Sequence, residues 1–192
     1  MHDAFSDHQT NWAFVKPLFE KQFTVYAMAR RGRGETDTTI GHSLEDESLD
    51  VVALMQSIGE PVFLLGHSYG AQTALAAAAQ VPDRTRKLVL YEAPWPHVVG
   101  KAAMGRLEEL AQAGDWEGFA VTFFRDTLFV PVEEVPVMLQ IGTESPRHLY
   151  VTDALAAVLP HVRIEALSGQ AHEGMTTAPE MYAEAVSRFL LS

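Results

Sequence analysis

Short apolar runs alternate along this chain with longer segments in which apolar residues recur at helical spacing. The short runs predict strands at residues 23–28, 62–65, 87–91, 136–141 and 162–167. The longer segments predict helices at residues 43–58, 71–80, 147–159 and 179–190. Because helices separate the strands, the pattern indicates an α/β fold, with a mostly parallel sheet of about five strands covered by helices on both faces. Functional residues of such sheets gather at the carboxyl ends of the strands.

One segment interrupts this alternation. Residues 95–135 show only helical patterns, and the second of these is rich in aromatic side chains. Simple core packing is one interpretation of the aromatic residues, and a lid over a site is the other. The lid is favoured because the segment leaves from the carboxyl end of a predicted strand. We expect a single domain over residues 1–192, with residues 95–135 as a reduced helical lid.

A serine stands between two glycines where the strand at residues 62–65 gives way to an alanine-rich helix. A turn this tight would bring any side chain at Gly66 or Gly70 into collision with neighbouring backbone. It would hold Ser68 at a strained backbone angle and expose its hydroxyl beside a helix N-terminus. An ordinary strand–turn–helix connection is the plainer interpretation. The context on both sides predicts a nucleophile elbow instead.

A serine hydroxyl needs a base within hydrogen-bonding reach before it can act as a nucleophile. His172 is the candidate, because it lies in a glycine-flanked loop directly after the last predicted strand and therefore at the same sheet edge as Ser68. His67 adjoins the serine, but its side chain is expected to point elsewhere. The other histidines are expected on the surface or in loops: His2, His8, His42, His97, His148 and His161.

Charge and composition narrow the classes of partner. The formal net charge of −11 argues against nucleic acid or an anionic membrane as a partner. Cysteine is absent, which excludes disulfides and thiolate metal sites, and no histidine pattern has zinc-ligand spacing. No apolar run is long enough to span a membrane, and the first residues lack a signal-peptide pattern. We expect a cytoplasmic protein that uses no metal and no cofactor.

Taken together, these motifs resemble the α/β-hydrolase superfamily over nearly the whole chain. The loop at residues 29–36 resembles the loop after the fourth strand of that superfamily, with Ala29 where an aspartate often stands. Val81-Pro82-Asp83-Arg84 before a strand is also typical, as is the final Gly169-Gln170-Ala171-His172 before a closing helix. The resemblance implies a nucleophile, an acid and a histidine in that order along the chain.

The acid has two candidates. The superfamily usually places it after the strand at residues 136–141, where this chain has Gly142-Thr143-Glu144-Ser145, with a serine in the expected position of the aspartate. A second known location follows the preceding strand, and Leu90-Tyr91-Glu92-Ala93 resembles the segment found there in one branch of haloalkane dehalogenases. We choose Glu92, because an acid leaving an apolar strand needs a partner, and keep Glu144 as the alternative.

The resemblance also implies an oxyanion hole. One donor would be the Tyr69 backbone N–H, and the other would come from the loop at residues 2–8. Relatives begin that loop with His-Gly, whereas this chain has His2-Asp3. Ala4 would then supply the second N–H, with Phe5 as the fallback.

On this alignment the chain begins where relatives have completed three strands. The third of these strands would lie between the strands at residues 23–28 and 62–65. Its absence would leave two strands unpaired along one side in the middle of the sheet, and exposed strand edges favour aggregation. Three outcomes are open: the two strands pair directly, a partner chain such as a second copy closes the edge as a homodimer, or the natural protein starts further upstream.

The resemblance implies a serine hydrolase that cleaves small-molecule carboxylic esters through Ser68, His172 and Glu92, with an acyl-enzyme intermediate. The alternative is a non-catalytic or degenerate binding protein on the same fold, favoured by Asp3 and Ser145 at positions where the family usually has glycine and an acid.

Overall fold

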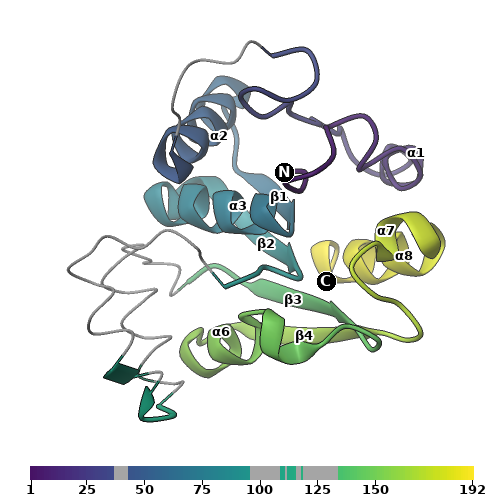
Figure 1. Cartoon of the computed structure of the whole chain (residues 1–192). Coiled ribbons are helices and arrows are strands. Elements are labelled where there is room, and N and C mark those ends of the chain that lie inside the picture. The colour runs from purple at the N-terminus through teal and green to yellow at the C-terminus, as the bar shows by residue number, and fades with distance from the viewer. Residues whose placement is uncertain (37–42, 96–108, 111, 116–117, 119–133) are drawn as a thin grey trace.

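The computed structural model describes residues 1–36, 43–95, 109–110, 112–115, 118 and 134–192. A parallel sheet forms its centre, with strands in the order β1-β2-β3-β4. These strands are β1 (Val62–His67), β2 (Thr85–Tyr91), β3 (Val137–Gly142) and β4 (Val162–Leu167). The α/β-hydrolase-like fold predicted from the sequence is therefore confirmed, and Figure 1 shows helices on both sides of the sheet.

Helices cover the two faces of the sheet through separate apolar clusters. On one face lie α2 (Leu44–Ile58), α3 (Tyr69–Gln80) and α6 (Thr152–Val158). On the other lie α1 (Lys16–Phe19), α7 (Gly174–Thr177) and α8 (Pro179–Leu190). Two short 3-10 turns, η1 (Pro82–Arg84) and η3 (Arg147–Leu149), lie before β2 and after β3. Both faces are therefore apolar, which agrees with the nearly continuous apolar sequence of the strands.

Local chemistry explains where the best-defined helices begin and end. The Ser43 side chain accepts a hydrogen bond from the Asp46 N–H, and the Asp46 side chain accepts from the Ser43 N–H, which forms a capping box before α2. Gly59 ends α2 in the left-handed conformation at φ 82°. The alanines of α3 are buried, which lets this helix lie close against β1 and β2.

Two expectations about secondary structure are wrong. Residues 23–28 belong to no strand, so the described sheet has four strands rather than about five. Residues 147–159 do not form one helix, because Tyr150 makes an isolated bridge to Pro94 between η3 and α6. The predicted lid at residues 95–135 falls mostly outside the described residues and stays a prediction. In the segments that the structure describes, no helix combines the length and apolar character needed to cross a bilayer.

Candidate active site

Ser68 occupies a strained turn at the carboxyl end of β1. Its backbone has φ 54° and ψ −123°, and its side chain makes no capping hydrogen bond to α3. A Cβ at Gly66 would lie 2.4 Å from the Gly70 carbonyl oxygen, and one at Gly70 would lie 2.3 Å from the His2 carbonyl oxygen. The two glycines therefore permit a turn that leaves the serine hydroxyl free of its own helix.

Glu92 is held in a second strained position one strand away. Its φ is 48°, and in the described chain Ser68 and Glu92 are the two non-glycine residues with positive φ. Its side chain is fully buried, and the Gly142 N–H donates to Oε1 at 2.8 Å. Backbone strain of this kind persists where surrounding contacts enforce it, and it concentrates at functional sites.

His172 contacts Glu92 directly. Its Nδ1 lies 2.7 Å from Glu92 Oε2, and about a third of its side chain (34%) is exposed. Burial raises the pKa of Glu92, but hydrogen bonding to His172 and Gly142 contributes to a larger opposite effect, so the net pKa falls below the ordinary value. Glu144 lies exposed in the turn after β3, with its N–H donating to the Gln170 carbonyl. Of the two acids weighed from the sequence, Glu92 is thus the one in contact with the histidine.

Tyr91 fixes the loop that carries His172. Its hydroxyl donates to the Ala171 carbonyl and accepts from the Gly174 N–H at 3.1 Å, so it holds the loop on both sides of the histidine. A Cβ at Gly174 would lie 2.6 Å from this hydroxyl, which explains the glycine. Burial, followed by the nearby Glu92 charge, raises the pKa of Tyr91 and keeps it a neutral donor. In the sequence Tyr91 looks like an ordinary strand residue, and no local pattern indicates this role.

Tyr150 forms a further contact with the histidine. Its hydroxyl lies 3.2 Å from His172 Nδ1, and the two rings stack with centroids 5.5 Å apart and planes at 19°. Burial and the Glu92 charge raise the pKa of Tyr150 to about 12. This neutral phenol therefore lies beside the Glu92–His172 pair and restricts the orientation of the ring.

The His172 ring lies beside the elbow, although within the described residues no hydrogen bond joins it to the Ser68 hydroxyl. The ring centroids of His172 and His67 are 4.6 Å apart, and His67 directly precedes the serine. With Nδ1 engaged by Glu92, His172 has Nε2 left for a further partner. Catalytic hydrogen bonds are often long without substrate and tighten in the substrate complex.

His67 is fully buried, stacked on Tyr91 with ring centroids 5.4 Å apart, and its Nδ1 lies 3.1 Å from Asn11 Nδ2. Burial, followed by the nearby His172, lowers the pKa of His67 to about 3. At neutral pH this imidazole is uncharged, with Nδ1 as the acceptor of the asparagine N–H. His172 is the better placed base of the two.

The loop at residues 2–8 is shaped by Asp3. Its carboxylate oxygen Oδ1 accepts hydrogen bonds from the Phe5 N–H at 3.0 Å, the Ser6 N–H at 2.6 Å and the Ser6 hydroxyl at 2.6 Å. The Phe5 amide, the fallback oxyanion donor, is therefore already engaged, and its side chain is 94% exposed. In the described chain the Ala4 N–H donates to no protein group, which leaves it available.

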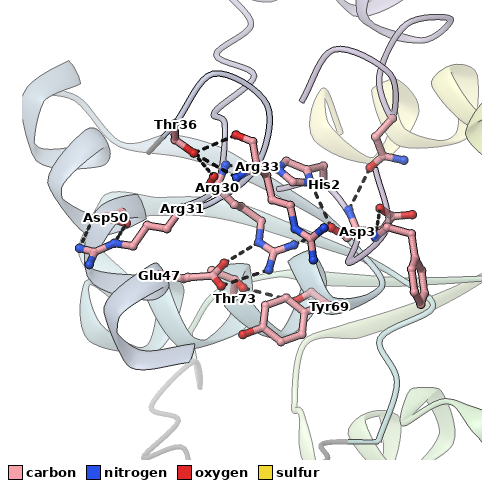
Figure 2. Close-up of polar contacts among 12 residues, drawn as sticks. His2, Asp3, Arg30, Arg31, Arg33, Thr36, Glu47, Asp50, Tyr69 and Thr73 are labelled. Atoms are coloured by element: carbon pink, nitrogen blue, oxygen red, sulfur yellow. Dashed lines mark hydrogen bonds and ion pairs between the residues drawn. The ribbon is translucent and has the colours of Figure 1, made fainter. Parts of the chain in front are cut away.

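A buried ion pair between Arg30 and Glu47 links this loop to α2 (Figure 2). Arg30 Nε lies 2.5 Å from Glu47 Oε2, with side-chain exposures of only 5% and 2%. Arg30 Nη1 also donates to the Asp3 carbonyl at 2.5 Å, and its guanidinium lies 4.3 Å from the centre of the Tyr69 ring. Arg30 thus connects the segments that carry Ala4 and Tyr69.

His2 belongs to the same buried group: it lies in a loop, which is one of its two expected placements, but it is not on the surface. It is fully buried, its Nε2 accepts from the Arg30 N–H at 3.2 Å, and its Nδ1 therefore donates to the Asp3 carbonyl at 3.0 Å. Burial, followed by the Arg30 charge, lowers the pKa of His2 to about 4. The sequence carries one signal for this buried group around Arg30. Glu47 lies on the same helical face as Val51 and Met55, and a carboxylate on a buried apolar face requires a cationic partner.

Asp3, His67 and Glu173 bring carboxylate and imidazole atoms within 4.8 Å of one another, which is a separation compatible with a shared cation. Two of the three are already engaged within the protein, since Asp3 Oδ1 accepts three hydrogen bonds and His67 Nδ1 faces Asn11. Asp3 and His67 therefore help to hold the loop at residues 2–8.

A parallel sheet with a serine elbow after β1 and a histidine loop after β4 defines the α/β-hydrolase class. The chain matches the model of the Alpha/beta hydrolase family over residues 2–190, and it belongs to that family. Among solved structures it is similar to epoxide hydrolase CorEH (TM-score 0.74, 15% identity, 99% of this chain and 89% of the other). It is also similar to an alpha/beta hydrolase from Sphaerobacter thermophilus (TM-score 0.68, 23% identity, 98% and 90%).

Curated relatives resemble parts of the chain. Human "Epoxide hydrolase 4" is 25% identical over 130 residues, which are 66% of this chain and 36% of the relative. The "2-(acetamidomethylene)succinate hydrolase" of Mesorhizobium japonicum is 30% identical over 110 residues, which are 55% and 39%. The matched region thus spans little more than a third of these relatives. All four of these proteins are named as hydrolases.

Proposed function

We propose that this chain is a serine hydrolase that cleaves small-molecule carboxylic esters through an acyl-enzyme. Ser68 is the nucleophile, His172 the general base and Glu92 the acid that orients it. The observation that carries the proposal is the pairing of His172 with Glu92 at 2.7 Å beside the strained serine turn. A half-buried serine hydroxyl, an imidazole and a buried carboxylate at one sheet edge have the chemistry of acyl transfer.

In the first half of the reaction, Ser68 Oγ attacks the carbonyl carbon while its proton passes to His172 Nε2. Glu92 stabilises the resulting imidazolium, because its carboxylate is held close to Nδ1. The tetrahedral intermediate collapses, the alcohol leaves with the proton from His172, and Ser68 keeps the acyl group. General acid–base catalysis of this kind contributes about 10²–10⁴-fold in rate.

Water then attacks the acyl-enzyme and gives its proton to His172, after which the carboxylic acid leaves and Ser68 recovers the proton. The Tyr69 and Ala4 N–H groups stabilise the oxyanion in both halves. Tyr69 is the first residue of α3, where unpaired N–H groups and the helix dipole favour negative charge. Each such donor contributes about 10²–10³-fold in kcat.

Ester hydrolysis is favoured over the other reactions suggested by the names of relatives. Epoxide hydrolases of this superfamily resemble the chain in sequence and fold, but their nucleophile is an aspartate, and this chain has Ser68 at the elbow. Other relatives are named as hydrolases of amide-like or carbamate bonds, which the same serine chemistry could attack. The alcohol of an ester is a better leaving group than the amine of an amide or carbamate. Its departure therefore needs the least proton transfer from the general acid.

The test is hydrolysis of p-nitrophenyl acetate and butyrate, with p-nitroacetanilide as the matched amide and styrene oxide as the epoxide. We expect ester turnover that is lost in Ser68→Ala and reduced at least about 10²-fold in Glu92→Gln, with Glu144→Gln as the matched control that retains activity. Turnover unchanged by Ser68→Ala in folded protein would refute the proposal. If Glu144→Gln loses ester turnover while Glu92→Gln keeps full turnover, the acid that orients His172 is Glu144 and not Glu92.

A further inference from the structure

Asn11 is buried, and both ends of its carboxamide are engaged. The residue is only 4% exposed. The Asp3 N–H donates to Asn11 Oδ1 at 3.2 Å, and Asn11 Nδ2 lies 3.1 Å from His67 Nδ1. Asn11 therefore joins the loop that carries Ala4, the second candidate oxyanion donor, to the residue that directly precedes Ser68.

The orientation of this carboxamide determines where the proton of the buried histidine lies. A backbone N–H can only donate, so the Asn11 oxygen has to face Asp3 and the Asn11 nitrogen has to face His67. The amide nitrogen also only donates, so His67 Nδ1 accepts and carries no proton. His67 Nε2 has no hydrogen-bond partner in the described chain, so the contact with Asn11 selects the tautomer. The result is a neutral ring with its proton on Nε2.

Several charges around His67 act against this neutral state. The ionisable side chains that face the ring come from three segments: Asp3, Tyr91 with Glu92, and His172 with Glu173. Asp3 Oδ2 lies 4.0 Å from Nδ1, and a carboxylate oxygen of Glu173 lies within 4.8 Å of a ring nitrogen. Negative charge so close favours the protonated ring, whereas burial and then His172 oppose it. A donor on Nδ1 adds to the opposing side, because it occupies the lone pair that a proton would take.

The charge of His67 matters because His172 lies beside it, with the two ring centroids 4.6 Å apart. In the proposed reaction His172 becomes positively charged when it takes the proton of the serine. A second positive charge at this separation would disfavour that step, since a charge within about 4–6 Å shifts the midpoint of a titration by about 1–3 pH units. A neutral His67 leaves the Glu92 carboxylate free to stabilise the imidazolium without opposition.

We propose that Asn11 is a positioning residue of the hydrolytic site, which keeps His67 uncharged beside His172 and holds the loop that presents the Ala4 N–H. The inference rests on the proposed function, and Asn11 itself contacts no reacting atom. A carboxamide serves both purposes because it accepts from the loop on one side and donates to the imidazole on the other. A carboxylate of the same shape can only accept.

The main test is Asn11→Asp, which keeps the shape and the acceptor for Asp3 but places an oxygen against His67. Asn11→Leu has a similar size and removes both hydrogen bonds without adding charge. Gln9→Glu is the matched control, because it makes the same change from carboxamide to carboxylate at an exposed side chain that donates to Glu35 at 3.1 Å. The measurements are NMR titration of ¹⁵N-labelled histidine rings, the pH dependence of kcat/KM for p-nitrophenyl acetate, and thermal unfolding.

In the wild type we expect His67 Nδ1 to carry no proton at neutral pH. In Asn11→Asp we expect Nδ1 to be protonated, His172 to titrate about 1 pH unit or more below its wild-type midpoint, and kcat to fall about tenfold or more. The acidic limb of kcat/KM then moves to lower pH, because the weaker base stays unprotonated further down. Asn11→Leu should lower kcat with KM unchanged and leave the limb in place, and Gln9→Glu should match the wild type.

A wild-type His67 that carries a proton on Nδ1, or an Asn11→Asp variant whose Nδ1 stays unprotonated, would refute the role of Asn11 in selecting the tautomer. A protonated Nδ1 in Asn11→Asp, with the His172 titration and kcat of the wild type, would refute its effect on the base. If Asn11→Asp does not fold, wild-type kcat in Asn11→Leu would overturn the role in the loop. The NMR titrations require no turnover, so a wild type that cleaves no ester would contradict the proposed function alone.

Discussion

The buried pair of Arg30 and Glu47 offers the sharpest test of how this protein holds its candidate oxyanion loop. Replacing Arg30 with methionine keeps most of the side-chain volume but removes the guanidinium. The variant leaves the Glu47 carboxylate buried at 2% side-chain exposure without its cationic partner, and it removes the hydrogen bond to the Asp3 carbonyl. The loop at residues 2–8 then loses its connection to α2 and to the Tyr69 ring.

The expected loss follows from the geometry of the pair. Arg30 contacts both carboxylate oxygens, at 2.5 Å from Nε and 3.1 Å from Nη2. Removing one partner of such a buried pair costs about 3–5 kcal/mol. For a domain of this length, each kcal/mol lowers the Tm by about 2–4 °C, so we expect a decrease of about 10 °C. Displacement of the second oxyanion donor should lower kcat by up to about 10²-fold.

The assay is thermal unfolding by circular dichroism, together with ester turnover. Arg31→Met is the matched control, because Arg31 makes a similar two-point contact with Asp50 at the surface and should leave the Tm nearly unchanged. The double variant Arg30→Met/Glu47→Leu removes both charges and should recover most of the lost Tm while turnover stays low. A double variant as unstable as the single one would refute the reasoning, because the loss would not come from the stranded carboxylate.

Three further predictions follow from the site. Gly66→Ala forces a Cβ to within 2.4 Å of the Gly70 carbonyl, so urea titration should show a loss of roughly 4 kcal/mol or complete failure to fold. Tyr150→Phe keeps the ring stack on His172 but loses the hydroxyl, so kcat should fall about threefold to tenfold with KM unchanged; an unchanged kcat would remove Tyr150 from the site. The pKa of Glu92 is lowered on folding, so its stabilising contribution exists above the ordinary value of 4.5 and disappears as pH falls through the folded pKa. The Tm difference between wild type and Glu92→Gln should therefore shrink below pH 4.5, and a constant difference would contradict this assignment.

The parts of the fold that follow from local sequence were predictable. Ser43 and Gly59 marked both ends of α2, and Pro179 marked the start of α8. The apolar run at residues 23–28 was predicted to be a strand, but a strand also requires a neighbour to pair with, and in the described chain none pairs with it. The break at Tyr150 depends on its bridge to Pro94, which is distant in sequence.

The candidate site likewise contains features that local sequence predicts and features that depend on contacts between distant residues. The spacing around Ser68 and the loop position of His172 were visible in the sequence, because a tight turn and a strand end are local features. The contact between Glu92 and His172 joins residues 80 positions apart, so the sequence could only narrow the acid to two candidates. The burial of His2 and Arg30 depends on packing between distant segments, which no local pattern specifies.

Reaction with an alkyl fluorophosphonate, followed by peptide mass spectrometry, tests most directly whether Ser68 is an activated nucleophile. We predict a single phosphonyl adduct on Ser68, with a labelling rate that collapses in His172→Ala. A folded protein that takes up no label, or one whose Ser68 is labelled equally fast without His172, would contradict the central claim.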